Sequence, residues 1–109
     1  MDAESIQEQL INTGLSERAL SMIIDVLRGN AGIRRAILFG SRAKGVAKPN
    51  SDIDLAIEGL DDDLDVARLA SSLDDLPLPY RFDLQRMESL KYQPLKEHIE
   101  RAGKVIYQK

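Results

Sequence analysis

The segment DIDLAIEG, which begins at Asp52, alternates between two kinds of side chain with a period of two. Successive side chains of a β-strand point to opposite faces, so Ile53, Leu55 and Ile57 fall on one face and Asp52 and Asp54 on the other. The pattern predicts a strand with a buried apolar face. The two aspartates then project side by side, where like charges repel each other, and we expect something positive to lie between them.

A second apolar run, AILF at residues 36–39, precedes this strand and ends at Gly40. A short apolar run bounded by charge and by glycine is typical of a buried strand. The loop between the two runs, SRAKGVAKPN, contains a glycine and a Pro49–Asn50 turn signal. The sequence therefore predicts two strands that are joined by a polar, basic loop.

The rest of the chain predicts four helices and two more strands. A capping box predicts a short helix at residues 5–14, and a stripe of apolar residues predicts a second from Ser16, which Gly29 ends in a left-handed cap. A third helix is expected at residues 61–75 after an acidic first turn, and Pro94 begins a fourth. The segments YRFDLQR and KVIYQ read as the remaining strands.

Composition excludes several classes of protein. With 109 residues the chain has the size of one ordinary domain, so whatever it acts on must largely be held by another molecule. The formal net charge of -3 disfavours nucleic acid as a direct substrate. The absence of cysteine removes disulfides, zinc-cysteine sites and thiol nucleophiles. The polar N-terminus and short apolar runs predict a cytoplasmic protein without a membrane segment.

Asp83 adds a third carboxylate, on the polar face of the strand predicted in YRFDLQR. If the acid-bearing strands are neighbours, Asp83 can approach Asp52 and Asp54. Three oxygen donors without histidine or cysteine select Mg²⁺, with Mn²⁺ as the second choice. Such ions usually complete their shells with substrate phosphates, so a phosphate-binding element is expected nearby.

The turn after the first apolar run can supply that element. Gly40 permits a close approach of the backbone, Ser41 offers a hydroxyl and an N–H, and a helical turn from Arg42 would point N–H groups at an anion. Arg42, Lys44 and Lys48 add positive charge to the same loop. Gly40, Ser41, Arg42 and Lys44 are therefore the candidate nucleotide contacts, although a solubilising role for Arg42 and Lys44 is equally compatible with the sequence.

The spacing of GS, ten further residues and DID, with a later aspartate in FDL, resembles the nucleotidyltransferase superfamily that includes DNA polymerase beta, and specifically its minimal nucleotidyltransferase (MNT) domain proteins. AILFGSRAKG, SDIDLAI, RFDLQRMESL and LKEHIERAGKVIY extend this resemblance over nearly the whole chain. It implies one domain over residues 1–109, of α+β class, with a small mixed β-sheet and helices packed mainly on one face. It also implies ATP as donor and two Mg²⁺ ions.

The resemblance further implies a role for each acid. Asp52 and Asp54 would bind both metal ions, and Asp83 would bind one ion and help to deprotonate the acceptor hydroxyl. Gly40 and Ser41 would form the phosphate turn. MNT proteins of this size resemble antitoxins that pair with a HEPN-domain toxin and transfer AMP to one of its tyrosines. A hetero-oligomer with a HEPN protein is therefore expected, and the small size gives a physical reason for an acceptor on another chain.

Each of these features also has a simpler interpretation. Two aspartates alone would suit a solvated strand end, Gly40–Ser41 an ordinary turn, and Asp83 an ion pair with Arg81 or Arg86. The acidic run at residues 61–65 suits a solvated helix start, His98 an exposed helix face, and the three tyrosines packing positions. EF-hand and Walker loops fail, because their glycines and ligands fall on the wrong residues. At the level of function, the rivals are a binding antitoxin or regulatory subunit without catalysis, and nucleotide transfer to a small antibiotic-like molecule.

Overall fold

The computed structural model describes residues 13–109, so the helix predicted at residues 5–14 falls outside it apart from Thr13 and Gly14. No helix in the described part has the length and apolar character that crossing a membrane requires. The elements follow one another as α2 (Glu17–Arg28), β1 (Arg35–Phe39), β2 (Ile53–Glu58), α3 (Asp63–Asp74), β3 (Phe82–Arg86), the 3-10 turn η1 (Met87–Ser89), α4 (Gln93–Ala102) and β4 (Lys104–Gln108).

The strands form a single mixed sheet in the order β3-β2-β1-β4. β1 pairs antiparallel with both β2 and β4, whereas β2 and β3 run parallel and are connected through α3. A parallel pair needs a crossover of a dozen or more residues, and α3 supplies it. The α+β class and the mixed sheet that the family resemblance implied are therefore confirmed.

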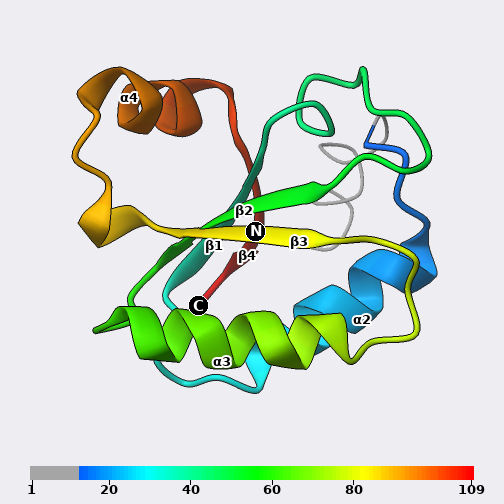
Figure 1. Ribbon diagram of the computed structural model, residues 1–109, viewed down its shortest axis with the longest axis horizontal. Coiled ribbons are helices and arrows are strands. Elements are labelled where there is room, and N and C mark those ends of the chain that lie inside the picture. The colour runs from blue at the N-terminus through cyan, green and yellow to red at the C-terminus, as the bar shows by residue number, and fades with distance from the viewer. Residues whose placement is uncertain (1–12) are drawn as a thin grey trace.

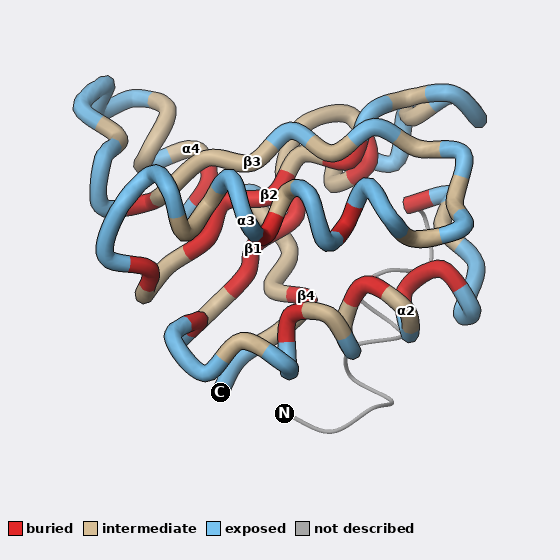
Figure 2. Tube along the Cα trace, turned by 60° about the horizontal axis from the view of Figure 1, so that its bottom comes forward, coloured by how far each residue is buried: buried red, intermediate tan, exposed pale blue. Residues whose placement is uncertain are grey.

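One face of the sheet packs on α2 and α3, which lie together below it in Figure 1. The apolar stripe of α2 and the alternate residues of β2 meet there, as their periods predict. Figure 2 shows the buried positions along the central strands and the inward sides of these two helices. The fully buried members of this core include Ile23, Leu27, Leu38, Ile53, Leu55, Ile57 and Leu73.

The opposite face carries a smaller core beneath α4, which lies on the other side of the sheet from α2 and α3 in Figure 1. Ile99 of α4 packs with Ile37, Ala56 and Met87, all of which are buried. The expectation of helices mainly on one face thus holds for α2 and α3, while α4 takes the other. Along β2, α4 covers the end that contains Ala56, whereas Asp54 is only half-buried.

The helix starts follow their sequence signals more closely than one of the ends. The Ser16 hydroxyl accepts the N–H of Ala19 at 3.1 Å. The Asp62 carboxylate accepts that of Asp65 at 2.9 Å, so the acidic run begins α3 as expected. The left-handed cap predicted at Gly29 is wrong, because this residue has φ -71° and donates its N–H to the Asp25 carbonyl in a right-handed last turn.

Candidate active site

The Gly40 turn and the acid-bearing strand β2 are in direct contact. Phe39, the last residue of β1, pairs with Asp54 across the antiparallel ladder. Gly40 follows with φ 77°, in the left-handed region that favours glycine. A Cβ at Gly40 would overlap the Asp54 carboxylate oxygen Oδ2. The backbone of the turn therefore lies against the carboxylate, as a site that holds both a phosphate and its counter-ion requires.

The third acid joins the first two through the parallel pairing of β2 with β3. Asp54 and Asp83 are register partners, so both side chains leave the same face of the sheet from neighbouring strands. Burial raises the pKa of Asp54, and the negative charges of Asp83 and then Asp52 raise this pKa further. The half-buried Asp54 carboxylate is thus close enough to both Asp83 and Asp52 to be repelled by their charges.

The donor types at this end of the sheet suit a hard divalent cation. Carboxylates without histidine or thiolate are the ligands of Mg²⁺ and Mn²⁺, and a cation here would relieve the repulsion at Asp54. The carboxylates are not arranged as a complete set of metal ligands. Within residues 13–109, no three acidic, histidine or cysteine side chains lie close enough together to form a metal-binding group. Asp52 and Asp83 are exposed, so their side chains have room to turn.

Residues 40–46 form one tight turn of helical character. The Gly40 carbonyl accepts the N–H of Lys44 at 3.2 Å, and the Ser41 carbonyl accepts that of Val46 at 3.1 Å. No hydrogen bond from the N–H of Ser41, Arg42 or Ala43 is found among residues 13–109. These three donors therefore begin the turn in the way that a phosphate-binding turn requires. Lys44 is exposed on the same turn.

Arg42 lies elsewhere than expected of a nucleotide contact. Its side chain is 1% exposed and points into the protein, where the guanidinium donates to the backbone carbonyls of Thr13, Pro49 and Ser51. The ring of Tyr80 lies beneath it, 4.7 Å from Cζ to the ring centroid. A guanidinium engaged in this way supports the loop from inside, so the expected contact with a nucleotide is not favoured for Arg42.

Several rival interpretations of the acids can now be compared with the structure. Asp83 forms no ion pair within the described chain, and its Oδ1 accepts only a long 3.5 Å hydrogen bond from Gln85. Arg86, one of its expected partners, instead pairs with Asp63 at 3.3 Å. Asp83 is therefore not held by an arginine.

The histidine and tyrosine expectations are met in part. Tyr80 and Tyr107 pack against the core, as expected. Tyr92 does not, because it is 69% exposed just before α4. His98 is half-buried on α4, so the expected exposed position is wrong. His98 lies three residues after Leu95 and one before Ile99, so it borders the apolar side of this amphipathic helix.

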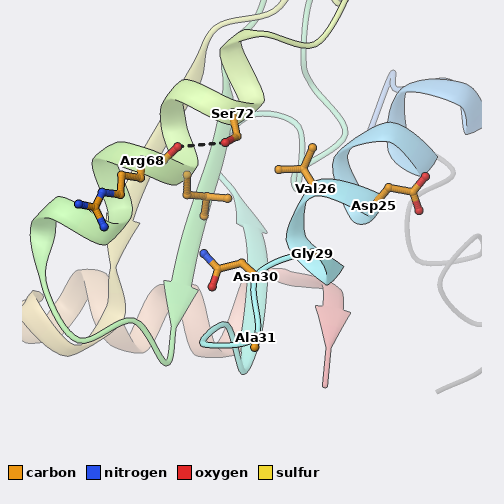
Figure 3. Close-up of a pocket in the computed structure, with 8 residues that line it drawn as sticks. Asp25, Val26, Gly29, Asn30, Ala31, Arg68 and Ser72 are labelled. Carbon is orange, nitrogen blue, oxygen red and sulfur yellow. Dashed lines mark hydrogen bonds between the residues drawn. The ribbon is translucent and has the colours of Figure 1, made fainter.

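A pocket of about 480 Å³ lies well away from the acids, between α2 and α3 (Figure 3). Asp25 and Asn30 line it from the end of α2 and the turn that follows, and Arg68 and Ser72 line it from α3. None of the candidate site residues contributes to it. Because α2 and α3 cover the face of the sheet opposite to Asp54, this pocket is not part of the acidic site.

Sequence reasoning missed the neighbours that shape the site. Phe39 flanks Asp54 on β1, and Gln85 contacts Asp83 from two positions along β3. A period of two places Gln85 on the Asp83 face, so that signal was available. The burial of Arg42 had no local signal, since its partners come from three separate segments of chain.

Comparison with known proteins agrees with this geometry. Residues 21–109 match the family model described as polymerase beta, nucleotidyltransferase. No curated protein sequence matches the chain. Among solved structures, a chain of a toxin–antitoxin with AMP-PNP is 29% identical, with TM-score 0.67 over 83% of this chain and 73% of that one. A chain of the toxin–antitoxin MntA-HepT is 26% identical, with TM-score 0.63 over 86% and 74%.

A more distant structure shares the fold. It contains a tri-AMPylated Shewanella oneidensis HEPN toxin in complex with an MNT antitoxin, and the matching chain is 24% identical. The TM-score is 0.66 over 87% of this chain and 74% of that one.

Proposed function

Because the chain belongs to the polymerase beta nucleotidyltransferase family, we propose that it transfers AMP from ATP to a hydroxyl acceptor in a Mg²⁺-dependent reaction. The observation that supports this most strongly is the contact between the Gly40 turn and the Asp54 carboxylate, with Asp83 as register partner of Asp54. A turn that presents backbone N–H groups beside carboxylates of two neighbouring strands suits a triphosphate together with its metal ions. Use of ATP also implies a cytoplasmic location.

In the proposed reaction, the acceptor oxygen attacks the α-phosphorus of ATP, the bond to the β-phosphate breaks, and pyrophosphate leaves. Gly40, Ser41 and Lys44 would orient the triphosphate. Asp52 and Asp54 would hold Mg²⁺, which neutralises phosphate charge and lowers the pKa of a hydroxyl when bound. Asp83 is exposed and accepts no hydrogen bond from an arginine within the described chain, so its carboxylate would take the acceptor proton.

We propose a tyrosine of a HEPN-domain toxin as the acceptor, which would make this chain the antitoxin of a two-protein complex. Two solved relatives that share more than a quarter of their residues with this chain are toxin–antitoxin structures, one with AMP-PNP. In the more distant complex the HEPN toxin is AMPylated, which is the chemistry that the proposal extends to this protein. A domain of 109 residues has little room for an acceptor site of its own.

The test is transfer of label from α-labelled ATP to a HEPN-domain protein that is co-expressed with this chain, read by intact-mass spectrometry of that protein. With wild type and Mg²⁺, the mass of the HEPN protein should increase by about 329 Da for each AMP group that is transferred. The double variant Asp52→Ala, Asp54→Ala should add none. As a matched control, Asp74→Ala with Asp75→Ala removes the same charge from the exposed end of α3 and should transfer normally. Equal labelling by both double variants would refute the proposal.

The second candidate is a binding antitoxin that acts by contact alone. It is favoured by one observation, namely that the described acids are not gathered into a metal-binding group in this structure. The same double variant separates the two functions. If it binds and silences the HEPN protein as well as wild type does, contact is sufficient. If it binds the HEPN protein but leaves it active, catalysis is required.

A further inference from the structure

Arg42 is a buried cation that joins three separate segments of the chain. Its Nη1 donates to the Thr13 carbonyl at 2.8 Å, and its Nη2 donates to the Ser51 carbonyl at 2.9 Å and to the Pro49 carbonyl at 3.4 Å. Nε adds a 3.3 Å bond to Ser51. Figure 1 shows the start of the described chain, in blue, beside the green loop between β1 and β2, where these bonds form.

The space around the guanidinium is shaped to receive it. Gly14 has φ 77°, and a Cβ at that position would lie 3.1 Å from Arg42 Nη1, so a larger residue would press on the guanidinium. On another side the ring of Tyr80 stacks against Cζ at 4.7 Å. A cation over an aromatic face is attracted to it, most strongly where water is excluded. Lysine could not reproduce this set, because it lacks the planar fork that reaches several acceptors at once.

The partners of Arg42 lie just before the first residues of β2 and β3, the strands that carry the acids. Ser51 immediately precedes Asp52, and Tyr80 precedes Asp83 by three residues. The N–H of Ile53 also donates to the Arg81 carbonyl at 2.8 Å, and this hydrogen bond joins the starts of the two strands. Arg42 itself follows Ser41 in the turn. One side chain therefore connects the turn to the starts of β2 and β3.

We propose that Arg42 is a positioning residue, which fixes the Gly40–Ser41 turn relative to the two acid-bearing strands and does not contact the nucleotide. The proposal rests on the proposed function, because it assigns the turn and the acids to one site. Arg42 acts through the backbone carbonyls that it holds. Its loss should make the loop at residues 41–51 and the segment just before β3 more mobile, even when no nucleotide is present.

The experiment compares Arg42→Lys with wild type by hydrogen–deuterium exchange of the full chain without nucleotide, and then by calorimetry with Mg²⁺ and AMP-PNP. The hydrogen-bonded amides of residues 44–53, including the Ile53 N–H that donates to the Arg81 carbonyl, should exchange faster by about tenfold or more, while the α2 and α3 core changes little. AMP-PNP affinity should fall by on the order of ten- to a hundredfold, as displaced site residues imply. Arg28→Lys is the matched control, since Arg28 is exposed and, within residues 13–109, forms an ion pair only with Asp25; it should change neither.

Two results would overturn the proposal. Unchanged exchange at residues 41–51 with lost affinity would make Arg42 a direct nucleotide contact. Faster exchange throughout the core with normal affinity of the folded fraction would make it a general stabiliser. If Arg42→Lys does not fold, Tyr80→Leu decides between the same outcomes, because it removes the ring and leaves the carbonyl contacts. Should wild type bind no AMP-PNP, the proposed function fails, while the exchange data still decide the role of Arg42.

Discussion

The carboxylate of Asp54 occupies the place where any residue other than glycine at position 40 would have its side chain. The contact joins the end of β1 to the second residue of β2. It makes the turn and the acid a single structural unit, so a change in one is expected to appear in the other.

We predict that Gly40→Ala abolishes binding of AMP-PNP with Mg²⁺ and lowers stability. The left-handed φ alone costs alanine about 1–2 kcal/mol, and the methyl group must also displace Asp54. Gly45→Ala is the matched control, because Gly45 has nearly the same φ, 76°, and lies five residues further along the same turn. Urea unfolding should show a loss in both variants, whereas calorimetry should show lost binding in Gly40→Ala alone. Normal binding by Gly40→Ala would contradict the site.

Asp54→Asn should stabilise the protein in the absence of divalent ions. The pKa of Asp54 is raised in the folded state, so keeping this group ionised at neutral pH costs folding free energy, and a neutral isostere removes that cost. Thermal unfolding in EDTA at pH 7 should give a higher midpoint for the variant. Addition of Mg²⁺ should then raise the midpoint of wild type and not that of Asp54→Asn. A lower midpoint for the variant in EDTA would show that the carboxylate has a stabilising partner.

Glu58 should contribute to stability in a pH-dependent way. Burial tends to raise its pKa, but hydrogen bonds from Arg35 at 2.9 Å and Arg34 at 3.1 Å, together with their charges, outweigh burial and lower it. A lowered folded pKa means that the stabilisation is complete above the ordinary glutamate pKa of about 4.3 and is lost as the pH falls below it. Glu58→Gln should therefore cost about 1 kcal/mol at pH 7 and much less near pH 3.

That difference can be read from urea unfolding at both pH values. Glu97→Gln is a suitable control because Glu97 is exposed on α4 and forms no ion pair within the described chain. It should leave the pH dependence as in wild type. An equal loss at both pH values in Glu58→Gln would mean that the arginines stabilise this position by packing and not by charge.

Lys44 is predicted to contact the triphosphate. It is exposed on the turn that begins at Gly40, so removing its charge should weaken AMP-PNP binding by about fivefold, which corresponds to about 1 kcal/mol. The loss should shrink as salt rises, because exposed charges are screened. Lys91→Ala removes an exposed lysine near the start of α4 and should leave the affinity unchanged. Equal affinities of Lys44→Ala and wild type at low salt would assign Lys44 to solubility alone.

The sequence predicted the described α-helices and strands because these depend on local periodicity, whereas the approach of Asp83 to Asp54 was expected only on the condition that their strands are neighbours, which the parallel pairing meets. The two-residue period of β2 placed Ile53 and Asp54 on opposite faces, and the structure agrees. The left-handed cap at Gly29 failed because glycine permits that conformation without requiring it. The role of Arg42 could not be predicted, since a positive charge beside a glycine turn looks the same in sequence whether its side chain faces solvent or the interior.

The side of the sheet on which α4 packs was also beyond the reach of the sequence. Leu95 and Ile99 indicate that one side of the helix is covered, but not by what. The clue was Ala56, which shares a face with Asp54 yet is fully buried. Ala56 lies between Asp54 and Glu58 on this face of β2, so its apolar side chain indicates that part of the face is covered. Only the folded structure shows that α4 is the helix that covers it.

The parallel pairing of β2 with β3 has a consequence for the order in which the molecule matures. A β1–β2 hairpin can bring Gly40 to Asp54 early, since only the loop at residues 40–52 separates the two strands. Asp83 can approach Asp54 only after α3 has formed the crossover and β3 has paired with β2. If Asp83 takes the acceptor proton as proposed, an intermediate that stops at the hairpin would be catalytically silent, and nucleotide transfer would have to wait until β3 has left the ribosome and paired with β2.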